Sequence, residues 1–317
     1  MRNPIFRPIP FPRRTARLVA MVSFAALLYN PSPVLAVPIL GPELASFAVL
    51  GASAVTNTGP TTLSGNLGVS NNSSPTGITG FFGTLANDGP GTYTGTAHQG
   101  DAFATLADSQ LVAAKTNLGL LGPGTILGAD LVGLTLTPGV YTVPAGVSNL
   151  TGALTLDGLG NANAFWLFQM DTLITSPASV VNVINTGTGA GVFWNVASSA
   201  TLDTTTDFEG NILALASITM NNGVTLDCGR ALAHTGAVTM INDTISLGCT
   251  GTGEEGSNGL SGIGLSYDTI GKVVVDTTTG KVVSTPGNVV SVPEPGTLLL
   301  LSSGLAGIIF WRKKETV

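Results

Sequence analysis

The sequence predicts a mainly β solenoid, a β-helix, with one long α-helix along its axis and a capping loop at one end. A segment of about 20 residues nearly repeats between Ser198 and Cys249, and such short repeats bury their apolar faces only by stacking. Within each repeat, apolar and polar residues alternate with the period of a strand that has one buried face. The composition, 42 glycines and 9% charged residues, suits short strands joined by tight turns.

Residues 1–36 have the order of a secretory signal peptide: a basic start, an apolar run from Leu18 to Leu28, and Val34-Leu35-Ala36 as a cleavage site. The alternative, an uncleaved membrane anchor, is disfavoured because an 11-residue run is short of the roughly 20 residues that span a bilayer. We therefore expect an exported protein whose folded body occupies residues 37–250.

The folded body is acidic. Between Val37 and Pro293 there are 4 basic and 16 acidic residues, a net charge of −12, while arginines and lysines cluster near the two chain ends. This charge argues against nucleic acid as a partner, and against a membrane except through the C-terminal tail.

The body is expected to open with a rung of short strands over residues 40–69, followed by a capping loop over 70–96. The loop is rich in Gly, Asn, Ser, Pro and Thr. A solenoid needs such a cap because its end rung would otherwise present unpaired strand edges.

One long helix is predicted over about residues 97–118. Thr96 and Gln99 have the spacing of a capping box, and Gly119, Gly122 and Pro123 end the segment. At 1.5 Å per residue the helix would be about 33 Å long, which is the height of roughly seven rungs spaced about 4.8 Å apart. Its apolar face comprises Phe103, Ala107, Leu111, Ala114, Leu118 and Leu121.

The strands after the helix carry a family resemblance. The segments AFWLFQM, GVFWNVASSATL, GNILALASITM and CGRALAHTGAVTM, in this order, resemble the bacterial and fungal ice-binding protein family, over about residues 41–250. The resemblance implies an irregular right-handed β-helix with a long helix alongside. It also implies adsorption to ice as the function, with no enzymatic activity.

The aromatic residues of these strands have two interpretations, a carbohydrate-stacking platform or core packing under the helix. Near-continuous apolar strands favour the core. The residues are Phe165, Trp166, Phe168, Phe193 and Trp194.

Outward threonines and asparagines at equivalent positions of the repeats are the candidate ligand-binding surface. A flat, rigid, weakly charged array of hydroxyl and methyl groups is suited to bind ordered water. The alternative is that threonine is simply common on solvent-facing strands. The candidate ice-binding face is Thr204, Thr206, Asn222, Thr225, Asn242 and Thr244, and the alternative face is Thr201, Thr219 and Thr239.

Cys228 and Cys249 are 21 residues apart, about one rung, so their Cα atoms are expected near 5 Å apart. Export to an oxidising compartment predicts a disulfide between them. A metal site is the competing interpretation, but His98 and His234 are isolated from other ligand-type residues.

A polysaccharide-degrading enzyme is the least favoured hypothesis. Such an enzyme needs clustered carboxylates or a base, and the densest acidic group is Asp203, Asp207, Glu209 and Asp227. No nucleophile, lysine or histidine accompanies this group, and no nucleotide or zinc motif appears. We expect no enzyme activity, no metal and no cofactor.

The C-terminus follows a linker over residues 251–291. Residues 292–317 contain Pro293-Glu294-Pro295, an apolar run over 297–311 and a basic end. This order resembles the PEP-CTERM sorting tail of Gram-negative bacteria, which implies a short transmembrane segment processed by an exosortase. The implied location is the cell surface, outer envelope or extracellular matrix. A structural or adhesive matrix component, with extracellular polysaccharide as partner, is the alternative function.

Overall fold

The computed structural model describes residues 37–145, 149–249, 257–262, 265–267 and 273–275. Parallel strands form two large sheets, and a small antiparallel sheet of three strands joins the chain ends of this region. The predicted mainly β architecture with one long helix is therefore confirmed for the described residues.

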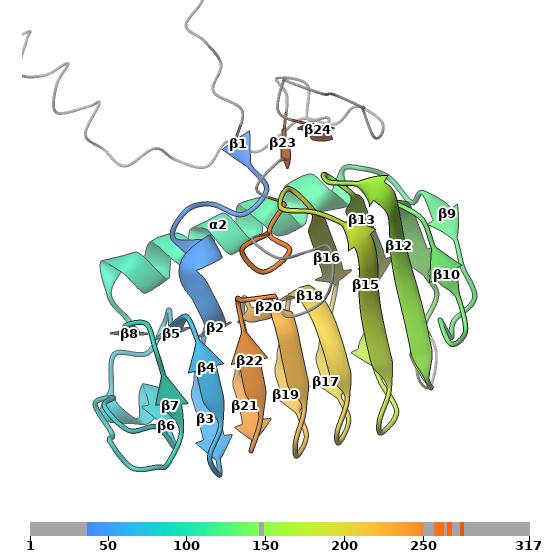
Figure 1. The fold of residues 1–317 in the computed structure, drawn as a ribbon. Helices are drawn as coiled ribbons and strands as arrows, with labels where there is room; N and C mark the ends of the chain where they lie inside the picture. The colour runs from blue at the N-terminus through green and yellow to red at the C-terminus, as the bar shows by residue number, and fades with distance from the viewer. Residues whose placement is uncertain (1–36, 146–148, 250–256, 263–264, 268–272, 276–317) are drawn as a thin grey trace, which may run out of the picture. The chain divides into compact units, whose positions relative to one another are not determined.

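The first large sheet has six parallel strands. In spatial order they are β14 (Leu173–Ile174), β17 (Ala200–Leu202), β19 (Ile218–Met220), β21 (Val238–Ile241), β3 (Val55–Thr58) and β6 (Ile78–Thr79). Of these, β6, β3, β21, β19 and β17 are labelled in the lower part of Figure 1.

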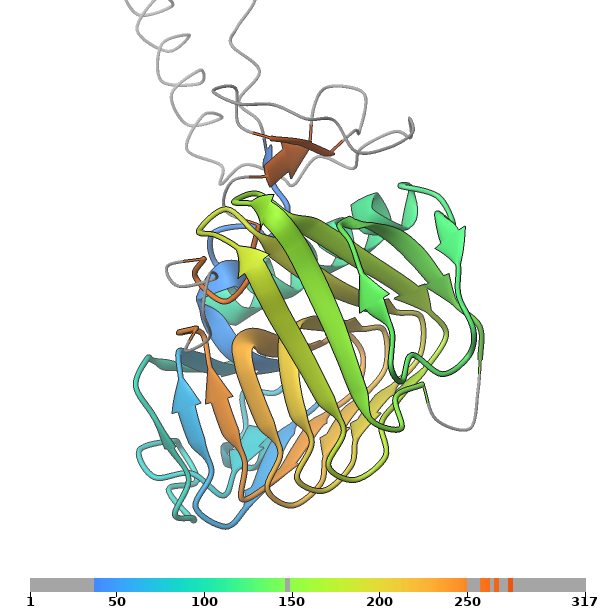
Figure 2. The same cartoon turned by 45° about the vertical axis from the view of Figure 1, so that its right-hand side comes forward.

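The second large sheet bends within β18 (Asp207–Ala214) and β20 (Thr225–Ala233), and so forms two further faces. The pairing register of β18 and β20 shifts between Glu209 and Gly210. Gly210 and Cys228 adopt positive φ angles of 101° and 50° at this corner. The long bent strands are visible in Figure 2.

The first halves of β18 and β20 lie on one face, between strands of neighbouring rungs. The other strands of this face are β10 (Thr135–Leu136), β12 (Ala153–Asn161), β15 (Val180–Thr186), β22 (Thr244–Ser246), β4 (Thr62–Ser64) and β7 (Thr92–Tyr93). The second halves lie on the face that the helix covers. Its other strands are β9 (Thr125–Ile126), β11 (Gly139–Val143), β13 (Phe165–Met170), β16 (Gly191–Val196), β2 (Phe47–Gly51), β5 (Asn66–Val69) and β8 (Ala97–Gln99).

The spatial order of the rungs differs from their order in the sequence. Strands β2, β3 and β4 pair with β20, β21 and β22, so the first rung stacks on the last repeat of the chain. The helix α2 (Ala102–Gly119) follows β8 at one end of the stack and leads to β9 at the other. The blue strands accordingly lie beside the orange strands in Figure 1.

The helix begins later than the sequence predicts. Residues 97–99 pair with Leu67, Gly68 and Val69 as strand β8, so the expected capping box at Thr96 and Gln99 is wrong. Gly100, with a φ of 62°, ends the strand. Asp101 is the N-cap, and its side chain accepts a hydrogen bond from the backbone N–H of Ala104.

Two hydrophobic cores lie on opposite sides of the sheet that contains β2, β13, β16 and the second halves of β18 and β20. One fills the interior of the stack, and the other lies between this sheet and α2. Trp166, Phe168 and Trp194 belong to the interior core, whereas Phe165 and Phe193 face the helix. All five side chains are at most 1% exposed, so the core interpretation of the aromatics is confirmed.

The predicted linker begins too early at residue 251. Ser257 and Leu260 are buried, and β23 (Leu265–Tyr267) pairs with both β1 (Val37–Pro38) and β24 (Val273–Val275). The physical reason is apolar burial, because Leu265, Tyr267 and Val273 join the core under the helix.

Several predicted segments lie outside the described residues. They are the signal peptide at 1–36, the end of the linker at 276–291 and the sorting tail at 292–317, including the apolar run at 297–311. Within the described residues, none of the helices has the length and apolar character needed to cross a membrane.

Candidate functional site

The six-stranded sheet carries a column of threonines on its outer surface. Strand pairing places Thr201, Thr219, Thr239, Thr56 and Thr79 at the same position of five consecutive strands, and Ile174 continues the column on β14. We call these five threonines the Thr219 column. Each is partly exposed, whereas the residue before it in the strand is buried.

The Thr219 column is rigid because each strand is fixed by backbone pairing to neighbours and by apolar side chains beneath it. Ile218 and Met220, which flank Thr219, are 0% exposed. Successive rungs are about 4.8 Å apart, and threonine has few side-chain rotamers. The hydroxyl of Thr56 also donates a hydrogen bond to that of Thr239, at 3.3 Å. The column therefore presents methyl and hydroxyl groups at a regular spacing.

A second threonine column lies on the adjoining face. Thr92, Thr62, Thr244 and Thr225 are in register on β7, β4, β22 and β20, and we call them the Thr225 column. The next position is Asp207. Burial and the nearby carboxylate of Asp227 raise the pKa of Asp207. The array of neutral hydroxyls therefore ends at this acidic rung.

The corner between the two columns contains three of the predicted site residues, Thr204, Asn222 and Asn242. Asn222 and Asn242 are exposed and Thr204 is partly exposed. Thr225 and Thr244 lie in the second column, so the candidate face predicted from the sequence spans a corner rather than one plane.

Thr206 does not lie on either surface. It is 1% exposed, and its hydroxyl is hydrogen-bonded to that of Thr175 at 2.9 Å. The expectation that Thr206 faces outward is therefore wrong, because the turn at Thr205, with a φ of 56°, directs the next residue inward.

The sequence interpretation omitted Thr56 and Thr79 from one column, and Thr62 and Thr92 from the other. These residues precede the helix, and Thr56 is separated from its neighbour Thr239 by 183 residues. A signal was present, because Val55-Thr56 has the same alternation as Val238-Thr239.

A family model described as ice-binding-like matches residues 49–246. The chain belongs to the ice-binding-like family. A second model, the PEP-CTERM protein-sorting motif, matches residues 291–314.

Individual relatives cover most of the ice-binding-like region. An ice-binding protein from Nostoc sp. (strain HG1) is 40% identical over 238 residues, which cover 75% of this chain and 84% of that protein. The crystal structure of an ice-binding protein from the Antarctic ascomycete Antarctomyces psychrotrophicus is similar, with a TM-score of 0.59 and 34% identity, covering 67% of this chain and 98% of that one. An ice-binding protein structure from an Antarctic biological consortium has a TM-score of 0.59 and 37% identity, covering 68% and 93% of the two chains.

Two acidic residues of this ice-binding-like chain, Asp203 and Glu209, accept hydrogen bonds from turns and strands. Asp203 accepts hydrogen bonds from Asn221 and from the backbone N–H of Thr204, which lower its pKa. Glu209 accepts from the backbone N–H of Val183 at 2.9 Å. Among the described residues, no group of three or more His, Cys, Asp or Glu side chains is arranged to hold a metal ion.

Two cationic side chains of the described residues, Lys115, which is partly buried, and Arg230, which is fully buried, make structural hydrogen bonds. Lys115 of α2 donates to the side-chain oxygen of Asn195 and to the carbonyls of Val196 and Leu213, and burial lowers its pKa to about 8. Arg230 is 0% exposed and donates to the side-chain oxygen of Asn211 and the carbonyl of Ala45. These side chains connect the helix and the N-terminal segment to the strands.

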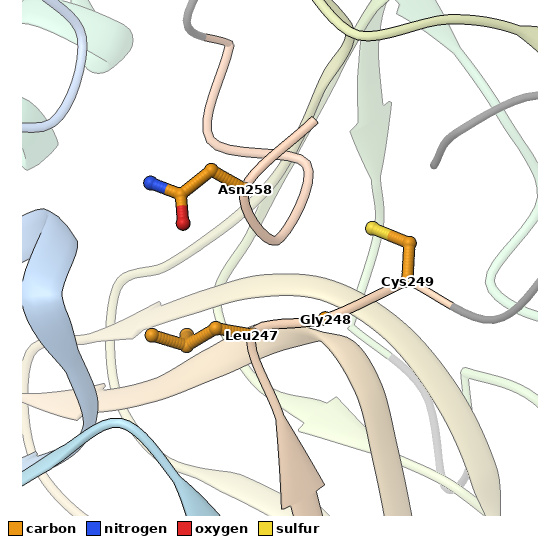
Figure 3. Close-up of a pocket in the computed structure, with 4 residues that line it drawn as sticks. All are labelled: Leu247, Gly248, Cys249 and Asn258. Atoms are coloured by element: carbon orange, nitrogen blue, oxygen red, sulfur yellow. The ribbon is translucent and has the colours of Figure 1, made fainter. Parts of the chain in front are cut away.

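The predicted disulfide between Cys228 and Cys249 is present, with Cα atoms 4.4 Å apart. Beside it is an open pocket of about 310 Å³ lined by Leu247, Gly248, Cys249 and Asn258. Figure 3 shows the first three on one segment and Asn258 on the loop opposite. None of these four described lining residues has a free titratable side chain.

Proposed function

We propose that this protein adsorbs to ice through the Thr219 column and acts as an antifreeze-type protein. The observation that carries the proposal is the register of five threonines on five consecutive parallel strands. The ice-binding relatives support it, since the matching region contains all five strands.

The physical basis is a match between two regular surfaces. Hydroxyl groups donate and accept hydrogen bonds with water molecules of the lattice, while methyl groups occupy spaces between them. Each contact is weak, and the array gains affinity because its side chains are already ordered before binding. Adsorbed protein would then block the addition of water to the ice surface.

The Thr219 column fits this role better than the Thr225 column. All five members of the first column are neutral, whereas the second column leads to Asp207 and lies beside Asp227 and Glu209. Ionised carboxylates hold strongly oriented hydration water, which would have to be displaced on binding to ice.

The proposal includes export and a right-handed coil. A connection between parallel strands of one sheet is right-handed in most proteins, and we infer the same hand here. The signal peptide predicted from the sequence and the sorting-motif match support export to the surface or exterior of a Gram-negative cell, with an exosortase as processing partner.

Ice-affinity partitioning and thermal hysteresis of the purified body, residues 37–275, test the proposal. Thr219→Tyr places a bulky ring in the middle of the column and should lower the ice-bound fraction at least tenfold, a change of about 1.4 kcal/mol. Thr116→Tyr, on the exposed side of α2, is the matched control and should leave binding unchanged.

The Thr225→Tyr variant tests which of the two threonine columns binds ice. If it alone abolishes partitioning, the second column is the ice-binding surface. If neither variant changes partitioning, or the unmodified body is absent from the ice fraction, the proposal is wrong.

The alternative, a matrix component that binds extracellular polysaccharide, receives less support from the described residues. Sugar rings commonly stack on aromatic side chains, but Trp166 and Trp194 are 0% exposed.

A further inference from the structure

Both ends of the described body meet in the small antiparallel sheet. Strand β1, near the start of the body, and β24, its last described strand, flank β23 on either side. Leu265, Tyr267 and Val273 of this sheet pack in the hydrophobic core that also contains Leu111 and Leu118 of α2. The chain therefore enters and leaves the body on its helix side.

The Thr219 column is on the opposite side of the body. The core under the helix, the sheet containing β2, β13 and β16, and the interior core all lie between α2 and the six-stranded sheet. Figure 1 shows β1, β23 and β24 beyond the helix, at the far side from β3, β21, β19 and β17. With layers about 10 Å thick, the exit of the chain is at least roughly 20 Å from the threonine surface.

Little chain separates this exit from the sorting motif. Residues 276–290, 15 in number, lie between β24 and the matched segment at 291–314. A random-coil chain of 15 residues has an end-to-end distance of roughly 20 Å, and full extension would give about 50 Å. A connection of the average length does not pass around the body to its opposite face.

The end segments are also held firmly to the core. Arg230 donates hydrogen bonds to the carbonyl of Ala45, just after β1, and to the carbonyls of Asn258 and Gly259, shortly before β23. The disulfide between Cys228 and Cys249 fixes the chain just upstream. These contacts fix the segments next to β1 and β23 to the strands of the body.

From this geometry we propose that the sorting tail attaches the body to the cell surface with the Thr219 column facing outward, so that the protein attaches the cell to ice. The proposal rests on the proposed function, because it needs the column to bind ice. It adds a direction and a second partner, the cell envelope that bears the protein.

The experiment measures how many intact cells a growing ice surface retains. The full chain is produced in a bacterium with a matching exosortase, and surface labelling of a tag quantifies display. Cells displaying the native chain should be retained at least tenfold better than cells displaying the Thr219→Tyr chain at equal density, and the Thr116→Tyr chain should match the native one.

A circular permutant tests the direction. A short Gly/Ser linker joins Val275 to Val37, since both strands flank β23, and new ends are opened between Gly59 and Pro60, in a turn beside the Thr219 column. With the signal peptide before Pro60 and residues 276–317 after Gly59, the threonine face should point toward the cell. Retention should fall at least tenfold at equal display, and a 60-residue Gly/Ser insertion before the tail should restore it.

The outcomes distinguish this proposal from the proposed function. Purified native and permuted bodies should partition equally into ice, which shows that both are folded and that the column works. If these bodies bind ice but native cells are not retained, or the permutant cells are retained as well as native cells, the attachment proposal is wrong. If the purified native body fails to bind ice, the proposed function fails, and this proposal fails with it.

Discussion

At the residue scale, the buried polar side chains carry out specific structural tasks. Arg230 is the clearest case, because its guanidinium is 0% exposed and donates to three carbonyls, those of Ala45, Asn258 and Gly259, in two segments, and to the side chain of Asn211. Planar guanidinium groups suit such multiple recognition, since their donors are fixed in direction. The N-terminal segment, the strands and the loop at 257–262 depend on this one side chain.

Replacing Arg230 with Met should lower the free energy of unfolding by roughly 3–5 kcal/mol, because the carbonyls around it would lose their donors inside the protein. Urea titration followed by circular dichroism measures the change. Thr116→Tyr on the helix surface is the control and should shift stability by less than about 0.5 kcal/mol. If Arg230→Met changed the free energy of unfolding as little as the Thr116→Tyr control does, water would have replaced the hydrogen bonds of Arg230.

Asp243 is predicted to make stability depend on pH. Its carboxylate is 1% exposed and accepts from the backbone N–H groups of Val224 and Ile241, yet burial outweighs these donors and raises its pKa to about 7. The folded state then binds more protons than the unfolded state, whose Asp pKa is about 3.9, so stability should fall as pH rises from about 4 to about 7.

The decrease from this one group should be at most about 4 kcal/mol. Unfolding of the native chain and of Asp243→Asn at several pH values measures it. The substitution removes the titration, so the difference in stability between the two proteins should change across this range. Parallel pH profiles would contradict the raised pKa.

At the scale of elements, the disulfide joins β20 to the segment that follows β22. Strands β20 and β22 also pair with each other. The chain between the cysteines, 21 positions apart, contains β21 and therefore Thr239 of the Thr219 column. The cross-link thus restricts the unfolded chain around part of the proposed ice-binding surface.

Removing the disulfide by Cys228→Ala together with Cys249→Ala should lower the free energy of unfolding by about 3 kcal/mol, the loop-closure value for this spacing. The folded fraction should still partition into ice, because the strand pairs of the Thr219 column remain. Chemical denaturation with and without reductant checks the first effect in the native chain. Loss of ice partitioning from a folded double variant would show that the cross-link also shapes the surface.

At the scale of the whole molecule, pairing between distant parts of the sequence makes the rungs one cooperative unit. The first strands, β2 to β4, cover the edges of β20, β21 and β22. In a stack that followed the sequence order, the first rung would not contact the last repeat. Here the first rungs continue the stack beyond its last repeat, form one of its ends and supply Thr56 and Thr79 to the column.

A chain that starts at Gly100 should therefore fail to fold cooperatively. It would expose the open edges of β20 to β22 and the buried side chains of Val238 and Ala231, and such edges associate with other chains. Size-exclusion chromatography and thermal circular dichroism should show aggregation and a broad transition. A monomer with a sharp transition would mean that the first rungs are dispensable.

Features that depend on neighbouring residues could be predicted from the amino-acid sequence. Alternation and the repeat of about 20 residues indicated stacked strands, and the same repeat aligned Thr201, Thr219 and Thr239 and placed two cysteines one rung apart. Burial of Trp166 and Trp194 also followed from the apolar character of their strands. These properties are local, because each strand exposes alternate side chains wherever it lies in the fold.

The identity of neighbouring rungs that are distant in the sequence is visible only in the folded protein. The tertiary structure added Thr56 and Thr79 to the column, placed Thr206 inside at a corner turn, and used residues 97–99 as a strand instead of the first turn of the helix. Strands select their partners by matching hydrogen-bonding edges and by burying apolar surface. For the first rung, both arise only after the strands that follow the helix have stacked back alongside it and reached β2, β3 and β4.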